Sequence, residues 1–144
     1  MSMNEKGQIK IEPVPPAGFN RAHSRYKLEV PVTAQILFPE ETFQPVCQTG
    51  STVDVSLRGL QVYLQNLHQD VYKKMVKTNR YIRLHFHDEV DGEPIKITGR
   101  IMWIDYHNSG AESQVGSCYV GIGLNEKESD LGKYTEFFKK IESV

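Results

Sequence analysis

The stretch YKLEVPVTAQILFP, residues 26–39, decides the fold class of this chain. From position 28 to position 38 every even residue is apolar, whereas most odd residues are polar. A period of two predicts one long strand over 26–38 that is buried on one face. Pro31 has no N–H to donate to a neighbouring strand, so it predicts an edge or a bulge within this strand, and Pro39 ends it.

The same alternation recurs further along the chain. It predicts more strand over 51–57, 60–64, 80–86, 95–104 and 115–124. Gly59, between the first two of these segments, predicts a bend, a bulge or a close approach of two backbones. The pair Asp91-Gly92 predicts a tight hairpin turn. Trp103 shares the apolar face of its strand and is predicted to lie in the core.

Two segments have a helical period instead. Residues 66–78 carry an apolar residue at every fourth position, which predicts a helix with Asn66 as its cap. At the C-terminus, apolar residues recur at spacings of three and four: Leu131, Tyr134, Phe138 and Ile141. We expect this amphipathic helix to pack on the strands; the alternative is that its stripe docks a partner.

Short strands, hairpin turns and a terminal helix predict a mainly all-β fold, either a small antiparallel barrel or a sandwich. Three parts are expected: a flexible N-terminal arm over 1–19, the β domain over 20–125 and the C-terminal helix over 126–144. The arm is expected to be irregular because helix and strand breakers recur in it: Pro13, Pro15, Pro16 and Gly18.

The composition is that of a globular domain. Of 144 residues, 39% are hydrophobic, and 17 basic against 18 acidic side chains leave a net charge of −1. This balance argues against bulk electrostatic capture of nucleic acid. No apolar run approaches the ~20 residues of a spanning helix, so no membrane insertion is expected. Residues 1–10 lack a secretory signal, which predicts a cytoplasmic protein with Cys47 and Cys118 as thiols.

Two local patterns carry the candidate chemistry. The first is RAHSR, residues 21–25, in which Arg21 and Arg25 repel each other and so favour an anion between them. A guanidinium offers a planar fork of donors that suits phosphate oxygens and the O6 and N7 atoms of guanine. This first pattern therefore predicts a site for a phosphate or a nucleotide.

The second pattern is DVSLRG, residues 54–59. Asp54 and Ser56 project from one strand face. The carboxylate can accept hydrogen bonds from the N1–H and N2–H₂ edge of guanine, and the hydroxyl can donate to a phosphate. Gly59 permits a backbone geometry or an approach that a side chain would block. Together the two patterns outline a guanine nucleotide site.

In order and spacing, the two patterns resemble the signature of the PilZ domain, a bacterial receptor for cyclic di-GMP: Arg-x-x-x-Arg followed by Asp/Asn-x-Ser-x-x-Gly. The resemblance covers roughly 20–124 and includes, less specifically, GRIMWI at 99–104 and YVGIGL at 119–124. It implies a six-stranded antiparallel PilZ-type β-barrel, often with a C-terminal helix. The segment 64–80 is longer than the usual connection of that family.

The resemblance also implies roles for the site residues. Arg21 and Arg25 bind phosphates and guanine Hoogsteen edges and stack on the bases, Asp54 binds a guanine Watson–Crick edge, Ser56 contacts phosphate and Gly59 allows the turn. Three further residues are candidate additions: Asn20, Arg58 and Gly121. The implied partners are cyclic di-GMP and a downstream protein, with no cofactor, metal or nucleic acid.

Other functional classes have weaker support. No nucleophile elbow, phosphate loop or zinc motif is present, so no enzyme is predicted. His85 and His87 alternate beside Asp88 and Glu89, but no further ligand is placed to complete a metal site. Aromatic and basic residues interleave too sparsely for a single-stranded nucleic-acid barrel. The remaining alternative is a PilZ-like interaction module that does not bind nucleotide.

Overall fold

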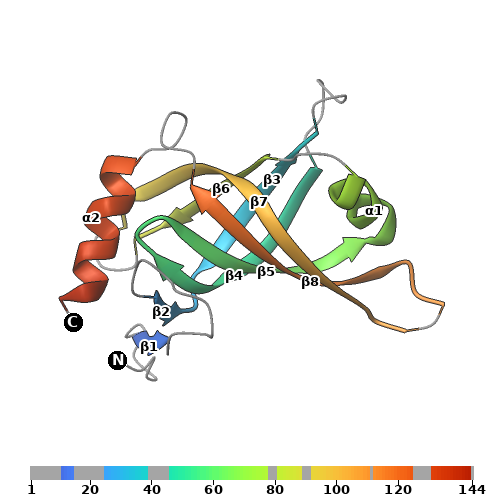
Figure 1. Cartoon of the computed structure of the whole chain (residues 1–144), viewed down its shortest axis with the longest axis horizontal. Coiled ribbons are helices and arrows are strands. Elements are labelled where there is room, and N and C mark those ends of the chain that lie inside the picture. Colours follow the sequence, from blue (N-terminus) through green and yellow to red (C-terminus); the bar gives the residue numbers. More distant parts are fainter. Residues whose placement is uncertain are drawn as a thin grey trace.

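The computed structural model of the chain describes residues 11–14, 25–38, 46–77, 81–88, 92–110, 112–124 and 131–143. The strands of this part are β1 (Ile11–Val14), β2 (Arg25–Leu28), β3 (Pro31–Leu37), β4 (Val46–Ser56), β5 (Gly59–His68), β6 (Tyr81–His87), β7 (Pro94–Asn108) and β8 (Val115–Leu124). Its helices are α1 (Gln69–Lys77) and α2 (Leu131–Glu142) (Figure 1).

Six of these strands close into a barrel (Figure 1). Around the ring the order is β4, β3, β6, β7, β8 and β5, and β5 pairs again with β4. Every pairing is antiparallel. The predicted six-stranded antiparallel barrel with a C-terminal helix is therefore confirmed. β2 pairs with the end of β4, and β1 pairs with β2 outside the ring.

The strand predicted over 26–38 is broken between β2 and β3. Thr52 of β4 holds the two sides of the break together, because its hydroxyl donates to the Leu28 carbonyl and accepts from the Val30 N–H at 2.9 Å. The register of β4 shifts between Thr52 and Asp54, and the Thr52 side chain is buried. β3 then begins at Pro31. The prediction of one continuous strand over 26–38 is therefore wrong, and the irregularity at Pro31 is a break between two strands, not an edge or a bulge within one.

Part of the N-terminal segment is regular, so the expectation of an irregular arm is wrong for Ile11–Val14. These residues form β1 and pair antiparallel with Arg25–Leu28. β1 lies at the edge of the described sheet, which is where a proline such as Pro13 is tolerated within a strand. Residues 15–24, which include Asn20 and Arg21, lie outside the described residues.

A bulge in β7 reverses the predicted alternation. Its pairing with β8 shifts register between Ile101 and Trp103. Ile101 stays buried, whereas Met102 and Trp103 both face outward and are 63% and 47% exposed. The prediction that Trp103 lies in the core is wrong, because one extra residue in a strand moves every later side chain to the other face.

Helix α1 begins later than predicted. β5 continues through Asn66, whose φ of 57° lies in the left-handed region that asparagine tolerates. The register with β8 shifts between Leu64 and Leu67, so Asn66 belongs to a bulge and not to a helix cap. His68 takes the capping role instead, since its Nδ1 accepts from the Asp70 N–H at 3.1 Å.

The two helices cover opposite ends of the barrel (Figure 1). α2 buries the side chains Tyr134, Phe137, Phe138 and Ile141. The Phe137 ring lies 5.3 Å from that of Phe86, and the Phe138 ring lies 5.7 Å from that of Tyr26. At the other end α1 buries Met75. The prediction that the C-terminal helix packs on the strands is confirmed.

Three remaining features bear on function. In the described ranges no helix combines the length and the apolar character needed to cross a membrane. Cys47 and Cys118 do not form a disulfide, and Cys118 is buried. Among the described side chains, no three or more of the His, Cys, Asp and Glu type are grouped as metal ligands; Glu89 lies outside this part.

Candidate functional site

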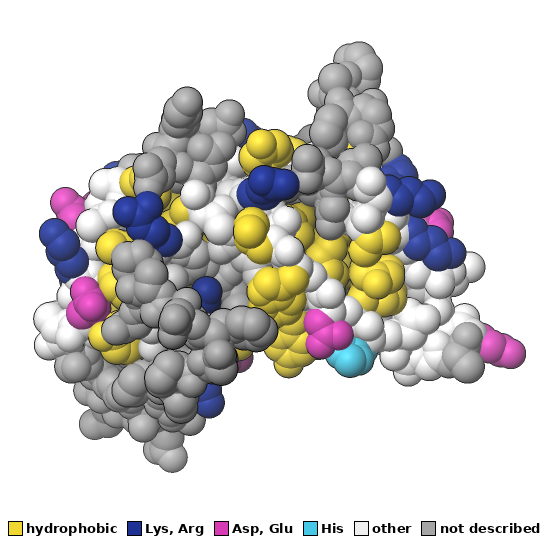
Figure 2. Space-filling model, in the orientation of Figure 1, with side chains coloured by type: hydrophobic (Ala, Val, Ile, Leu, Met, Phe, Trp, Pro, Cys, Tyr) yellow, Lys and Arg dark blue, Asp and Glu magenta, His cyan; other side chains and the backbone are white. Residues whose placement is uncertain are grey.

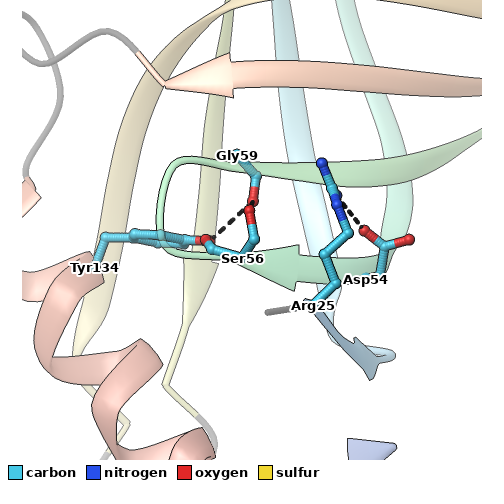
Figure 3. A network of polar contacts seen from close by, with 5 residues as sticks. All are labelled: Arg25, Asp54, Ser56, Gly59 and Tyr134. Carbon is cyan, nitrogen blue, oxygen red and sulfur yellow. Dashed lines mark hydrogen bonds and ion pairs between the residues drawn. The ribbon is translucent and has the colours of Figure 1, made fainter. Parts of the chain in front are cut away.

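The DVSLRG segment forms the hairpin between β4 and β5. Asp54 and Ser56 end β4, Leu57 and Arg58 make the turn, and Gly59 begins β5 opposite Ser56. The Ser56 hydroxyl donates to the Gly59 carbonyl at 3.0 Å (Figure 3). The interruption predicted at Gly59 is therefore a reversal of the chain. It brings the two ends of the motif side by side.

Arg25 reaches this hairpin from β2, where it is opposite Ser56 in the register. Its Nη1 donates to Asp54 Oδ1 at 2.7 Å (Figure 3). The Asp54 side chain is only 10% exposed and that of Arg25 is 27% exposed. A charge-assisted bond of this length orients the guanidinium. It uses one of the five N–H donors of that group.

An open pocket of about 330 Å³ lies on the outer wall of the barrel beside this ion pair. That volume falls within the roughly 300–1,000 Å³ of small-molecule sites. Arg25, Ser56 and Arg58 line its polar side. Asp54 is not among the lining residues, but it contacts Arg25, which is.

Glycines allow the strands to come close together in the floor of the pocket. A Cβ on Gly59 would lie 2.5 Å from the Ile122 carbonyl oxygen, and one on Gly121 would overlap the Trp103 indole ring. In the described part, Gly92 alone among the glycines has a positive φ. Gly59 therefore serves the close approach of β5 to β8 beside the turn, one of the roles expected for it from the sequence.

The bulge in β7 supplies an apolar wall. Met102 and Trp103 both line the pocket, and Figure 2 shows hydrophobic side chains gathered across the middle of this face of the molecule. The indole lies over Gly121. An exposed indole next to guanidinium donors offers a planar base a stacking surface beside groups that bind its phosphate.

The C-terminal helix touches the same hairpin. The Tyr134 hydroxyl donates to the Ser56 carbonyl at 2.6 Å and lies 3.4 Å from the Gly59 carbonyl (Figure 3). Burial raises the pKa of Tyr134 well above its ordinary value, and the positive charge of Arg25 opposes this only in part. The hydroxyl is thus a permanent donor that ties α2 to the motif.

Most of the predicted site residues meet at this corner. Arg25, Asp54, Ser56 and Gly59 lie together, and the two candidate additions Arg58 and Gly121 line the same pocket. Arg21 and Asn20 lie outside the described residues. Arg25 and Asp54 were expected at one site for separate tasks; the structure pairs them directly.

Sequence reasoning missed three residues: Met102, Trp103 and Tyr134. The first two are exposed by a bulge whose position depends on pairing with β8, and alternation within β7 alone predicts the opposite face. Tyr134 was assigned to an apolar stripe, and its hydroxyl gives no periodic signal. The glycine opposite Trp103 in the register, Gly121, was the one available hint.

Comparison with known proteins agrees with this geometry. The family model described as the PilZ domain matches residues 19–137. That match spans the barrel, the pocket and the start of α2, and it includes both local patterns. No curated protein was found to match the chain.

Proposed function

The chain belongs to the PilZ domain family, and we propose from this membership that it is a receptor for cyclic di-GMP that acts without catalysis. Domains of this family generally bind cyclic di-GMP and are binding modules, not enzymes. The proposed ligand contacts come from Arg21, Arg25, Asp54, Ser56 and Gly59. Asn20, Arg58 and Gly121 are proposed to complete the site.

The observation that carries the proposal is the position of Arg25. Asp54 holds its guanidinium at 2.7 Å beside a pocket that the Trp103 indole also lines. A nucleotide needs both surfaces, because its phosphates seek charged donors and its bases seek flat apolar partners. The pair of surfaces supports nucleotide binding more than it supports an apolar or a purely anionic ligand.

Two polar groups change partners in the proposed complex. The Ser56 hydroxyl turns from the Gly59 carbonyl toward a phosphate oxygen. Asp54 Oδ1 continues to accept a hydrogen bond from Arg25, and Oδ2 accepts one from the edge of a guanine. A carboxylate has about four lone-pair sites, so it can serve both partners at once.

The relay to a partner is proposed to start at the arm. Arg21 and Arg25 repel each other until the ligand phosphates neutralise them. The ligand then draws the segment that carries Arg21 onto the barrel at Asp54 and Ser56, and this ordering creates a new surface for a downstream protein. The alternative is an interaction module that binds a protein through the same wall without nucleotide.

Titration calorimetry of the full chain with cyclic di-GMP, and with GTP as the control ligand, tests the proposal. We expect binding that is selective for the cyclic dinucleotide. Arg25→Ala should weaken it by about 1–3 kcal/mol, the scale of a lost charged hydrogen bond. Lys77→Ala on exposed α1 is the matched control and should bind as the unmodified chain does. Absence of binding to a folded chain would favour the interaction module.

A further inference from the structure

The wall of the barrel opposite the pocket is centred on β6. In the ring order β4, β3, β6, β7, β8, β5, strand β6 is three strands from β5 in either direction. The pocket is built around β5 and β8, with Met102 and Trp103 from the part of β7 that lies beyond Arg100. The outer face of β6 and its neighbours is therefore a separate surface.

This face collects basic side chains. Along β6 the core residues alternate with outward Arg83, His85 and His87. Lys96 of β7 is directly opposite His85 in the register. On the other side β3 places uncharged Thr33 next to His85. Among the described residues, no outward position of β3 or β6, or of β7 as far as Arg100, carries a carboxylate.

Two positive charges on this face, those of Arg83 and Lys96, have no acidic partner among the residues that the structure describes. Within the described part, no ion pair joins Arg83 or Lys96 to an acidic side chain. Arg83 lies two residues from His85 along the strand, and Lys96 faces it from the next strand. Like charges at such neighbouring positions on a sheet repel each other.

His85 is a second, independent observation that favours an anionic partner on the outer face of β6. Its Nε2 is buried, and in the described part it has no hydrogen-bond partner. Burial lowers the pKa of His85, and the charges of Lys96 and Arg83 lower it further. A buried polar atom without a partner is costly. An anion above the face would offset the charges of Arg83 and Lys96 beside this ring.

We propose that Arg83, His85 and Lys96 form a docking site for an acidic segment of a partner protein, which binds through its Asp or Glu carboxylates. A polynucleotide fits less well, because a chain of net charge −1 with two fixed cations at this point lacks the extended positive track that nucleic acid requires. The site does not depend on the nucleotide pocket. In this proposal the ligand and the partner protein bind to opposite walls of one barrel.

Nuclear magnetic resonance with a blocked hexaglutamate peptide as the probe tests the proposal on the full chain. The peptide should shift the His85 imidazole signals and raise the pKa of that ring toward its ordinary value. The double variant Arg83→Gln, Lys96→Gln should bind about tenfold more weakly, since both attractive charges are lost. The matched double variant Lys73→Gln, Lys77→Gln on α1 should bind as the unmodified chain does.

Three results would overturn the site. The first is a peptide that leaves the His85 signals unmoved. The second is equal weakening in the α1 double variant, which indicates a general charge effect. The third is tighter binding at His85 by an oligothymidine strand or by inorganic phosphate than by the peptide. Arg25→Ala should leave the peptide titration unchanged, so failure of the nucleotide proposal remains distinguishable from failure of this one.

Discussion

The Tyr134 hydroxyl donates to the carbonyl of Ser56 at 2.6 Å, and the two residues are 78 positions apart in the chain. This bond joins the C-terminal helix to the hairpin that carries DVSLRG. Since the Tyr134 side chain is fully buried, no water replaces the bond if it is lost. The helix is thus held in place by the backbone of the candidate site itself.

Tyr134→Phe should lower the free energy of unfolding by about 1–2 kcal/mol, because it leaves a buried carbonyl without its donor. Urea unfolding followed by circular dichroism measures the effect. Tyr119→Phe, which removes a hydroxyl from partly exposed β8, is the control and should change stability by less than about 0.5 kcal/mol. Equal losses in the two variants would mean that the Tyr134 bond contributes nothing specific.

Arg25 and Asp54 should be energetically coupled. Arg25→Gln and Asp54→Asn each remove one charge of a partly exposed pair, so each should lower the free energy of unfolding. The loss of unfolding free energy in the double variant should be about 1 kcal/mol smaller than the sum of the two single losses. The reason is that the second substitution removes no further interaction. A double-mutant cycle in urea measures the coupling. Strict additivity would contradict the 2.7 Å ion pair as a working contact.

Gly121→Ala should displace the Trp103 indole without unfolding the chain. The new methyl group overlaps side-chain atoms of the ring, and that ring can turn away toward solvent. Trp103 is the only tryptophan, so its emission should shift to the red, and cyclic di-GMP affinity should fall. Gly110→Ala in the β7–β8 loop meets no atom within 4 Å and is the control. Unchanged emission in Gly121→Ala would contradict the stacked position.

Gly59→Ala and Gly132→Ala should have opposite effects on stability. Gly59→Ala places a methyl group 2.5 Å from a backbone carbonyl oxygen, and the backbone cannot shift there without a cost. The free energy of unfolding should therefore fall by about 1–3 kcal/mol. The second, on the exposed side of α2, meets nothing and should stabilise the helix by up to about 1 kcal/mol. Thermal unfolding of both variants gives the signs directly.

Cys118 should resist thiol reagents at neutral pH. Burial raises its pKa to about 12, so the folded chain keeps this thiol neutral, whereas an unfolded thiol ionises near pH 8.5. The buried neutral thiol therefore contributes fully to the stability of the fold below about pH 8.5. This contribution is lost as the pH rises toward 12. A thiol titration at pH 8 should count exposed Cys47 alone until urea is added. Immediate reaction of both thiols would contradict the burial.

Most of the architecture could be predicted because it rests on local alternation. Every even residue from Leu28 to Phe38 is buried as the period of two requires. The errors occur where alternation breaks, at the bulges near Asn66 and Met102. A bulge is defined by two strands that pair out of step, so neither strand alone carries the information. The outward position of Met102 and Trp103 at the pocket was missed for the same reason.

The candidate site divides in a similar way. Asp54, Ser56 and Gly59 are close in sequence, so their meeting in one hairpin follows from local geometry. The link from Tyr134 to Ser56 and the wall formed by Trp103 depend on the closure of the barrel. Contacts between residues so far apart in the chain cannot be predicted from the alternation of polar and apolar residues along the sequence.

A ring of strands has no ends, and this limits how another chain can associate with the barrel. Edge strands with unpaired backbone groups invite strand exchange and fibrous aggregation. Here the described sheet continues past the ring through β2 to β1, whose sequence includes Pro13. A proline at such an edge withholds one donor from any incoming strand. Concentrated solutions of the chain should therefore stay free of fibrils. Removal of β1 should make fibrils more frequent.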